Sequence, residues 1–308
     1  MTSNPATIES GTVSVERATR QFRLQRRVAY ASVGIPAIGF VVAMVLAAEH
    51  GIGWMEVSLL ASMYFLTAIG IEGGMHRFFS HHAFKAGPIV TAFFAIAGSM
   101  AVQGPVLFWA ATHRKHHAFA DLPGDPHSPR LHGTGFFNGL RGLWHAHVGW
   151  LFTGGQPDWS RYVPDLLADR WVFRLNQYYP FWVLLGLIVP AAIGGAVTGS
   201  WEGAGSGLLW GGLVRIFLLD QVVWSVNSFA HIVGRRAYAT KCNSGNIAFM
   251  SLLSVGGSWH NNHHFRPLYA RNDHQPWQLD PSGWFIELLA AFGLVWGVRR
   301  PKDKAQAV

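Results

Sequence analysis

Nine of the 16 histidines in this chain stand in short groups whose spacing is typical of metal ligands. Two groups share the pattern HxxHH, which places side chains three and four residues apart on one face of a helix. Another pair is five residues apart, and this spacing predicts that a helix ends or loosens between them. The nine candidate ligands are His76, His81, His113, His116, His117, His231, His260, His263 and His264.

These residue types restrict the metal chemistry. Nine imidazoles are too many for one ion, whereas two six-coordinate ions would use nearly all of them. Cys242 is the single cysteine, so a disulfide within the chain and a cysteine-built metal site are both excluded. An imidazole set suits iron, zinc or copper, and the ligand types alone do not choose between them.

The segments around the histidines predict a membrane protein. Half of the residues are hydrophobic and only 13% are charged. Four apolar runs approach or reach the roughly 20 residues that span a bilayer. We expect these spans at 28–48, 54–74, 181–197 and 208–230. A further apolar run, 88–111, should not cross, because a crossing would put the first two histidine groups on opposite sides of the membrane.

Smaller features of these segments also carry expectations. Arg215 and Asp220 are expensive in hydrocarbon, and we expect them to form a structural ion pair. The last apolar stretch, 288–298, is too short to span and should be a helix lying at the membrane surface.

The net charge of +8 is concentrated at the two ends of the chain. Five arginines precede the first span, and the connectors within both predicted hairpins lack lysine and arginine, so we expect both termini in the cytoplasm. We interpret the basic ends as anchors on anionic lipid and expect no nucleic-acid partner.

Four short motifs, HRFFSHHAF, HRKHH, NSFAH and HNNHH, resemble those of the membrane fatty acid desaturase family, in its stearoyl-type delta-9 branch. The stretches DLPGDPHSP and WHAHVGWLF strengthen the resemblance, which runs from the first span to about Pro301. It implies an all-α integral membrane protein with four transmembrane helices and a cytoplasmic helical cap that holds a diiron site. By the same resemblance the nine histidines are the iron ligands, Asn227 contacts the site through water, and a narrow tunnel bends the acyl chain beside the metals.

Other residues near these motifs have supporting roles in this interpretation. Asp121 and Asp125 would orient ligating imidazoles, and Trp224 would line the tunnel. We leave His127, His145 and His147 out of the metal set. Five basic residues would hold a phosphate-bearing carrier or attract anionic lipid: Arg114, Lys115, Arg235, Arg236 and Lys241.

The expected activity is oxygen-dependent insertion of a cis double bond, at delta-9, into a saturated acyl chain held by coenzyme A, acyl carrier protein or a lipid. The alternatives are hydroxylation, desaturation of a specialised acyl intermediate, and a non-catalytic metal-dependent sensor, which the complete ligand set disfavours. Electrons must come from a separate ferredoxin or small haem protein, because the chain lacks a haem domain, a flavin fingerprint and a cysteine cluster.

We expect a cytoplasmic segment over 1–27, the desaturase domain over 28–301 and a basic tail over 302–308, in a bacterial cell membrane. Some positions depart from the family's usual pattern. The run Gly256-Gly257-Ser258-Trp259, the run Phe265-Arg266-Pro267 and His82 leave the choice of headgroup and substrate open.

Overall fold

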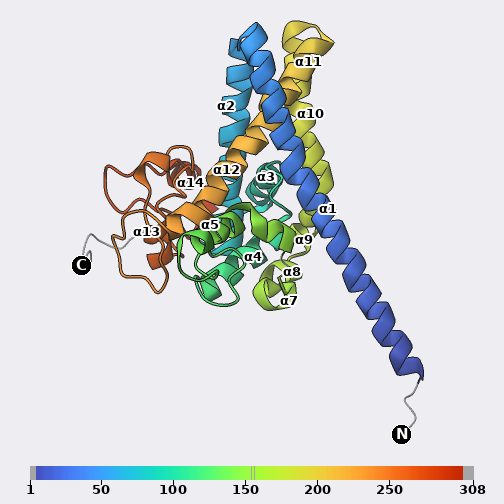
Figure 1. Ribbon diagram of the computed structural model, residues 1–308. Helices are drawn as coiled ribbons and strands as arrows, with labels where there is room; N and C mark the ends of the chain where they lie inside the picture. The colour runs from blue at the N-terminus through green and yellow to red at the C-terminus, as the bar shows by residue number, and fades with distance from the viewer. Residues whose placement is uncertain (1–4, 154, 156, 301–308) are drawn as a thin grey trace.

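The computed structural model describes residues 5–153, 155 and 157–300, and the protein it shows is mainly helical (Figure 1). Four of its helical segments are long and apolar enough to cross a membrane, which confirms the predicted number of spans. Their bounds are Phe22–His50, Trp54–Ser80, Tyr179–Thr198 and Trp201–His231. The predicted tail over 302–308 lies outside the described residues.

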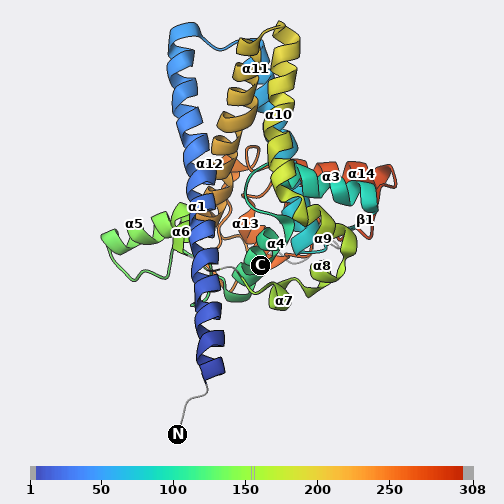
Figure 2. The ribbon, with the colours of Figure 1, turned by 90° about the vertical axis from the view of Figure 1, so that its right-hand side faces the viewer.

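The first span is part of one long helix, α1 (Pro5–His50), whose N-terminal half extends away from the other elements (Figures 1 and 2). The predicted N-terminal segment therefore continues directly into the membrane helix over its described part. The return span begins as α2 (Trp54–Ile69) and continues as a π-helix, η1 (Gly70–Ser80).

The second hairpin is built from α10 (Tyr179–Thr198), α11 (Trp201–Gly207), the π-helical η3 (Leu208–Val214), α12 (Arg215–Ser228) and the 3₁₀ turn η4 (Phe229–His231). Glycines allow its two arms to approach closely. A Cβ atom on Gly194 would lie 2.2 Å from the carbonyl oxygen of Gly203, and one on Gly207 would lie 2.2 Å from that of Pro190. Larger residues at these positions would push the arms apart.

The predicted ion pair between Arg215 and Asp220 is wrong. Arg215 is fully buried and donates to the carbonyl oxygens of Met100 (2.6 Å), Gly186 (3.0 Å) and Gly211 (3.2 Å). Residues five apart on an α-helix point in different directions, and Asp220 bonds to another residue, Gln103.

As predicted, the apolar run 88–111 does not form a spanning helix. It contains α3 (Pro88–Ser99), a turn over residues 100–105, and the start of α4 (Val106–Phe119). The turn includes Val102 and Gly104 with φ of 66° and 100°, and these left-handed conformations interrupt the helix.

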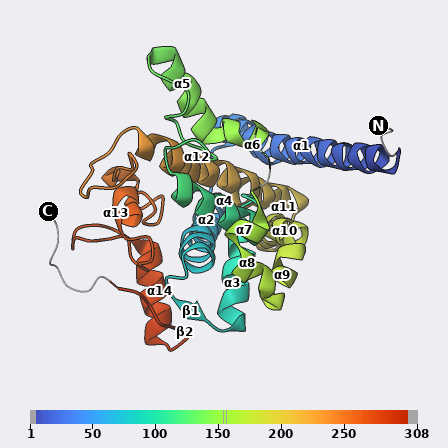
Figure 3. The ribbon, with the colours of Figure 1, turned by 90° about the horizontal axis from the view of Figure 1, so that it is seen from below.

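The remaining elements gather around one end of the four spans (Figures 1 and 3). They are α5 (Phe136–Trp144), η2 (His145–Gly149), α6 (Trp150–Thr153), α7 (Trp159–Tyr162), α8 (Pro164–Ala168), α9 (Arg170–Gln177), η5 (Ala248–Met250), α13 (His260–Phe265) and α14 (Pro281–Ala291).

The predicted surface helix over 288–298 is wrong in its bounds. Its helical part, α14, begins earlier, where Asp280 caps the helix by accepting a hydrogen bond from the backbone of Gly283. Gly293, with φ of 70°, follows the end of the helix, and β2 (Val295–Trp296) then pairs antiparallel with β1 (Lys85–Ala86).

Candidate metal centre

The nine predicted histidines come together in two adjacent clusters. The first cluster contains five: His76, His81, His113, His117 and His263. Their Nε2 atoms face one another, with His76 and His263 2.9 Å apart, His81 and His113 2.8 Å apart, and His263 and His117 3.0 Å apart.

The second cluster contains the other four: His116, His231, His260 and His264. Here the Nε2 atoms of His231 and His260 are 2.9 Å apart, and those of His260 and His264 are 3.0 Å apart. His116 completes the group at 3.4 Å from His264. Each cluster therefore collects ring nitrogens from elements that are far apart in the sequence.

The π-helix explains the spacing of the first pair. The backbone nitrogen of His81 donates to the carbonyl oxygen of His76 at 3.2 Å, a bond between residues five apart. In this wider turn, residues five apart share a face, whereas in an α-helix they would not. The predicted loosening between His76 and His81 is confirmed.

Both HxxHH triplets are helical, and each divides its side chains between the clusters. On α4, His113 and His117 join the first cluster and His116 joins the second. On α13, His263 joins the first cluster, while the other two histidines of the triplet join the second. The two short helices thus connect the clusters.

Carboxylates contact the outer ring nitrogens of several of these histidines. Nδ1 of His116 lies 2.9 Å from Asp125, and Nδ1 of His231 lies 3.1 Å from Asp121, so the predicted placement of both aspartates is confirmed. When Nδ1 donates its proton to a carboxylate, Nε2 carries the lone pair that a metal needs.

The aspartates are suited to remain charged in this role. Burial alone would raise the pKa of Asp125, but the neighbouring imidazole of His116 outweighs it and holds the pKa below its ordinary value. Burial of Asp121 is likewise outweighed, here by its hydrogen bond to His231. Both groups therefore accept hydrogen bonds as carboxylates at neutral pH.

The imidazoles are suited to remain neutral. Burial, followed by the proximity of other imidazoles, lowers the pKa of six of them well below the ordinary value: His81, His113, His117, His260, His263 and His264. Neutral rings whose Nε2 atoms face one another cannot all donate hydrogen bonds, and metal ions would satisfy these lone pairs. The donor set fits two metal ions.

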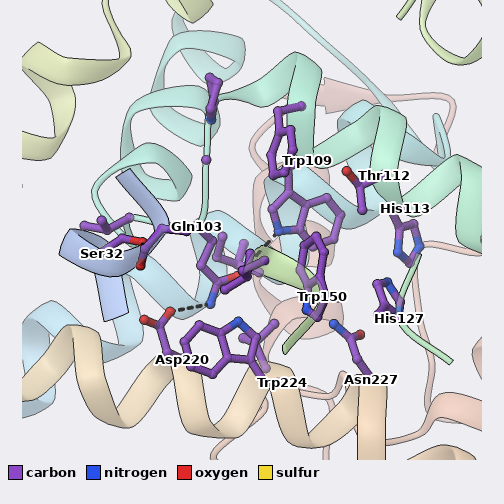
Figure 4. A pocket seen from close by; sticks show the side chains of 18 of the residues that line it. Ser32, Gln103, Trp109, Thr112, His113, His127, Trp150, Asp220, Trp224 and Asn227 are labelled. Atoms are coloured by element: carbon purple, nitrogen blue, oxygen red, sulfur yellow. Dashed lines mark hydrogen bonds between the residues drawn. The ribbon is translucent and has the colours of Figure 1, made fainter. Parts of the chain in front are cut away.

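A cavity of about 1140 Å³ adjoins the clusters, and His76, His113 and His260 form part of its wall. The cavity is otherwise largely apolar and reaches α1, α10 and α12 (Figure 4). Asn227 and Trp224 both line it, on the same helix. Asn227 makes no hydrogen bond to a histidine within the described residues, so its contact with the metals through water stays a prediction.

The three excluded histidines have other contacts. His147 bonds to Ser228 and Gln221, both at 3.1 Å, and His145 packs near His132. His127 stacks on His116 with ring centroids 4.5 Å apart and forms a smaller group with it and Asp125. Since this group shares His116 with the second cluster, His127 belongs to its surroundings.

Several supporting residues were missed in the sequence. Glu72 lies 2.9 Å from Nδ1 of His76, and Trp109 stacks on His113 with ring centroids 5.1 Å apart. Each precedes its histidine by four residues, a spacing that could have revealed it. Cys242 is buried, and its sulfur lies 3.4 Å from Nδ1 of His264.

Arg114 is not available to bind a phosphate-bearing carrier, because its guanidinium group already bonds to other residues. It bonds to Asp165 at 2.6 Å and to three backbone carbonyl oxygens, including those of Phe79 and Ser80. Lys115, by contrast, lines the cavity.

The family model of fatty acid desaturases matches residues 52–281, a stretch that includes all nine histidines. The chain belongs to the fatty acid desaturase family. Its curated relatives in this family are oxidoreductases that act on acyl groups.

A relative in Moorena producens, hex-5-enoyl-[acyl-carrier protein] acetylenase, is 44% identical over 272 residues, covering 88% of this chain and 85% of its own length. The sn-1 stearoyl-lipid 9-desaturase of a Synechocystis species is 32% identical over 258 residues, with coverages of 82% and 75%. The stearoyl-CoA desaturase of Capra hircus is 33% identical over 252 residues, with coverages of 80% and 66%.

Proposed function

We propose that this desaturase-family protein inserts a double bond into an acyl chain, using two iron ions, dioxygen and externally supplied electrons. The observation that carries this proposal is the adjacency of two imidazole clusters to a large apolar cavity. An acyl chain in the cavity would lie beside the metal centre, where its C–H bonds are otherwise unreactive.

Iron bound by the nine histidines would supply the oxidising power, drawn from dioxygen, that removes two hydrogens from neighbouring carbons. The protein itself binds and orients the chain. Trp109, which stacks on His113, and Trp224 contribute flat apolar surfaces to the cavity wall. In this proposal Asn227 lies beside the metals and contacts them through a water molecule.

The specialised alternative is an acyl chain on a carrier protein, with an existing double bond converted to a triple bond. Its support is the 44% identity to an acetylenase named for a hex-5-enoyl-[acyl-carrier protein] substrate, against 32% and 30% for two 9-desaturases. Under this alternative the delta-9 position does not apply, because the acyl chain is shorter.

The orientation belongs to the same proposal. The exposed arginines Arg20, Arg23 and Arg27 near the start of the first span support a cytoplasmic N-terminus, since positive charge is retained on that side. The metal clusters lie at the same end of the spans, so both the site and its donor, a ferredoxin or small haem protein, would be cytoplasmic.

The test is the fatty acid profile of bacterial cells that express the protein with a matched electron donor, by gas chromatography and mass spectrometry with double-bond localisation. A new monounsaturated acid that disappears in His260→Ala is expected. Hydroxy acids would replace the proposal with hydroxylation.

A second arm supplies purified, iron-loaded protein, in the presence of dioxygen and the reduced electron donor, with hexenoyl and stearoyl groups on acyl carrier protein or coenzyme A. Conversion of hexenoyl to hexynoyl, without conversion of stearoyl, would select the specialised alternative. Absence of any oxygen-dependent product in both arms would overturn the proposed activity.

A further inference from the structure

Three acidic side chains line the largely apolar cavity, and Asp220 is the one that contacts no histidine, since Glu72 lies against His76 and Asp125 against His116. Asp220, on α12, is only 3% exposed. One of its carboxyl oxygens accepts a hydrogen bond from Nε2 of Gln103 at 3.0 Å, as Figure 4 shows. The other oxygen has no hydrogen-bond partner within the described part of the chain.

No neighbouring polar group bonds to this second oxygen within the described residues. Ser32 donates to the carbonyl oxygen of Ala29. The hydroxyl of Tyr179 accepts from the backbone of Gly104 and keeps its own proton, but it makes no hydrogen bond to Asp220. Arg215, the cation nearest along the helix, donates to three carbonyl oxygens. With no protein donor bonded to it, the second carboxyl oxygen would take its hydrogen bond from water or from a group on the molecule that occupies the cavity.

The free-energy cost of leaving this carboxyl oxygen without a hydrogen bond determines which acyl chains the cavity binds more tightly. An unsubstituted acyl chain lying against Asp220 would remove water from a carboxyl oxygen and offer no donor in exchange. A chain that carries a hydroxyl or amino group at this point would supply the missing hydrogen bond.

The position of Asp220 relative to the metal centre follows from the helix. Asp220 precedes Asn227 by seven residues, which is about two turns or roughly 10 Å along the axis, on nearly the same face. Both residues line the same cavity. A donor bound by Asp220 would thus lie roughly two helical turns from the carbons beside the histidines.

Asp220 is also connected to the first histidine cluster. Gln103 donates to Asp220 through its nitrogen, and its oxygen accepts from Nε1 of Trp109 at 3.4 Å. Trp109 in turn stacks on His113. This chain of contacts gives Asp220 a second role, since it fixes the amide orientation of Gln103.

We propose that Asp220 is a specificity-determining residue that binds a hydrogen-bond donor, a hydroxyl or amino group, on the acyl chain of the substrate. The proposal rests on the proposed function, because it takes the cavity to be the acyl site. It predicts a substrate that is functionalised along its chain, in place of an ordinary saturated fatty acid.

The experiment measures binding to purified, iron-loaded protein in detergent. Quenching of tryptophan fluorescence reports occupancy, because Trp109, Trp150 and Trp224 line the cavity. The ligands are pantetheine thioesters of hexanoic, octanoic, decanoic and dodecanoic acids, each compared with its ω-hydroxy and ω-amino forms. The proteins are the wild type, Asp220→Leu, Asp220→Asn and the control Ile216→Val, which changes an apolar residue of the cavity wall.

The wild type should bind at least one functionalised ligand about tenfold or more tightly than its unsubstituted form. Asp220→Leu should lose or reverse this preference, and Ile216→Val should keep it. Asp220→Asn, which retains an accepting oxygen, should keep a preference for hydroxyl and lose one for the charged amine. Equal binding of both forms by the wild type at every length would overturn the proposal, as would an unchanged preference in Asp220→Leu.

Two controls keep the outcomes separate. Thermal unfolding in detergent shows whether each variant folds. If Asp220→Leu does not fold, Asp220→Asn still tests the amine preference. Product analysis is run with the same ligands after addition of dioxygen and the reduced electron donor. Selective binding without desaturation would reject the proposed activity and keep the binding site, whereas desaturation without selectivity would do the reverse.

Discussion

The two histidine clusters have the same kind of ligand but different supports. In the second cluster, aspartates contact Nδ1 of His116 and His231 directly. In the first cluster, Glu72 contacts His76 and is itself held by Arg77, which also binds Asp280 at 2.8 Å through each of two nitrogens. The second cluster is thus oriented by two aspartates of the loop that follows α4, and the first by a buried ionic network that ties η1 to residues about 200 positions away.

This difference separates two tasks that carboxylates perform around metal sites. A carboxylate bonded to an imidazole fixes the ring and makes it a better ligand. A carboxylate bonded to a buried arginine mainly joins elements of the fold, since breaking such a pair leaves a charge without a partner. Changes at the first cluster's support should therefore act on stability, and changes at the second cluster's support on metal affinity.

The largest effect is expected when a ligand itself is removed. His263→Ala and His264→Ala, one in each cluster, should both reduce desaturase activity to background, because both metals are needed for the proposed reaction. Iron content by mass spectrometry should fall by at least half in each. His147→Ala is the matched control, as its ring bonds to Ser228 and Gln221 outside the clusters. Wild-type activity in either ligand variant would contradict the proposed metal centre.

Arg77→Met should produce the largest loss of stability. It leaves the carboxylates of Glu72 and Asp280 buried without their cation, which typically costs about 3–5 kcal/mol. Denaturant unfolding of the detergent-solubilised protein measures the loss. Arg300→Met is the control, since its pair with Glu287 is exposed and should be worth about 1 kcal/mol or less. Similar losses of stability in both variants would show that the buried ionic network contributes no more to folding than the exposed pair does.

Asp125→Asn should act on the metal. Removing the charge that contacts His116 should weaken iron binding about tenfold to a hundredfold, with a smaller effect on unfolding than Arg77→Met has. Iron retained against chelators of increasing strength gives the affinity. Glu49→Gln, an exposed carboxylate on α1, serves as the control. If Asp125→Asn destabilised the fold and kept its iron, the division of roles between the supports would be wrong.

Cys242→Ala should have the smallest effect. Its sulfur is only a weak hydrogen-bonding partner for Nδ1 of His264, so iron affinity should change by about threefold or less. The same chelator assay detects this change. A loss greater than tenfold would place the thiol among the main supports of the second cluster.

The features that could be predicted from the sequence are those that depend on local patterns of residues. The four spans follow from apolar length, and the separation of His76 and His81 correctly indicated a loosened helix. The placement of Asp121 and Asp125 could be predicted because turns near a metal motif often supply carboxylates. The spans, the loosened helix and the contact of Asp125 with His116 require knowledge only of residues close in sequence, whereas the contact of Asp121 with His231 joins residues 110 positions apart.

The predictions that the structure corrects depended on contacts between residues that are distant in the sequence. Proximity along the chain predicts a pair between Arg215 and Asp220, but two of the three carbonyl oxygens that Arg215 bonds to belong to distant segments of the chain, at Met100 and Gly186. The bounds of α14 depend on Asp280, whose other contacts include Arg77, about 200 residues earlier. The division of each HxxHH triplet between two clusters likewise requires the arrangement of α4 against α13.

That division has a consequence for how the enzyme matures. Because α4 and α13 each carry histidines of both clusters, the first ion to bind would hold both helices in position and order imidazoles that a second ion needs. Uptake of two ions would then be cooperative. Newly made protein would pass from empty to fully loaded with little of the singly loaded form.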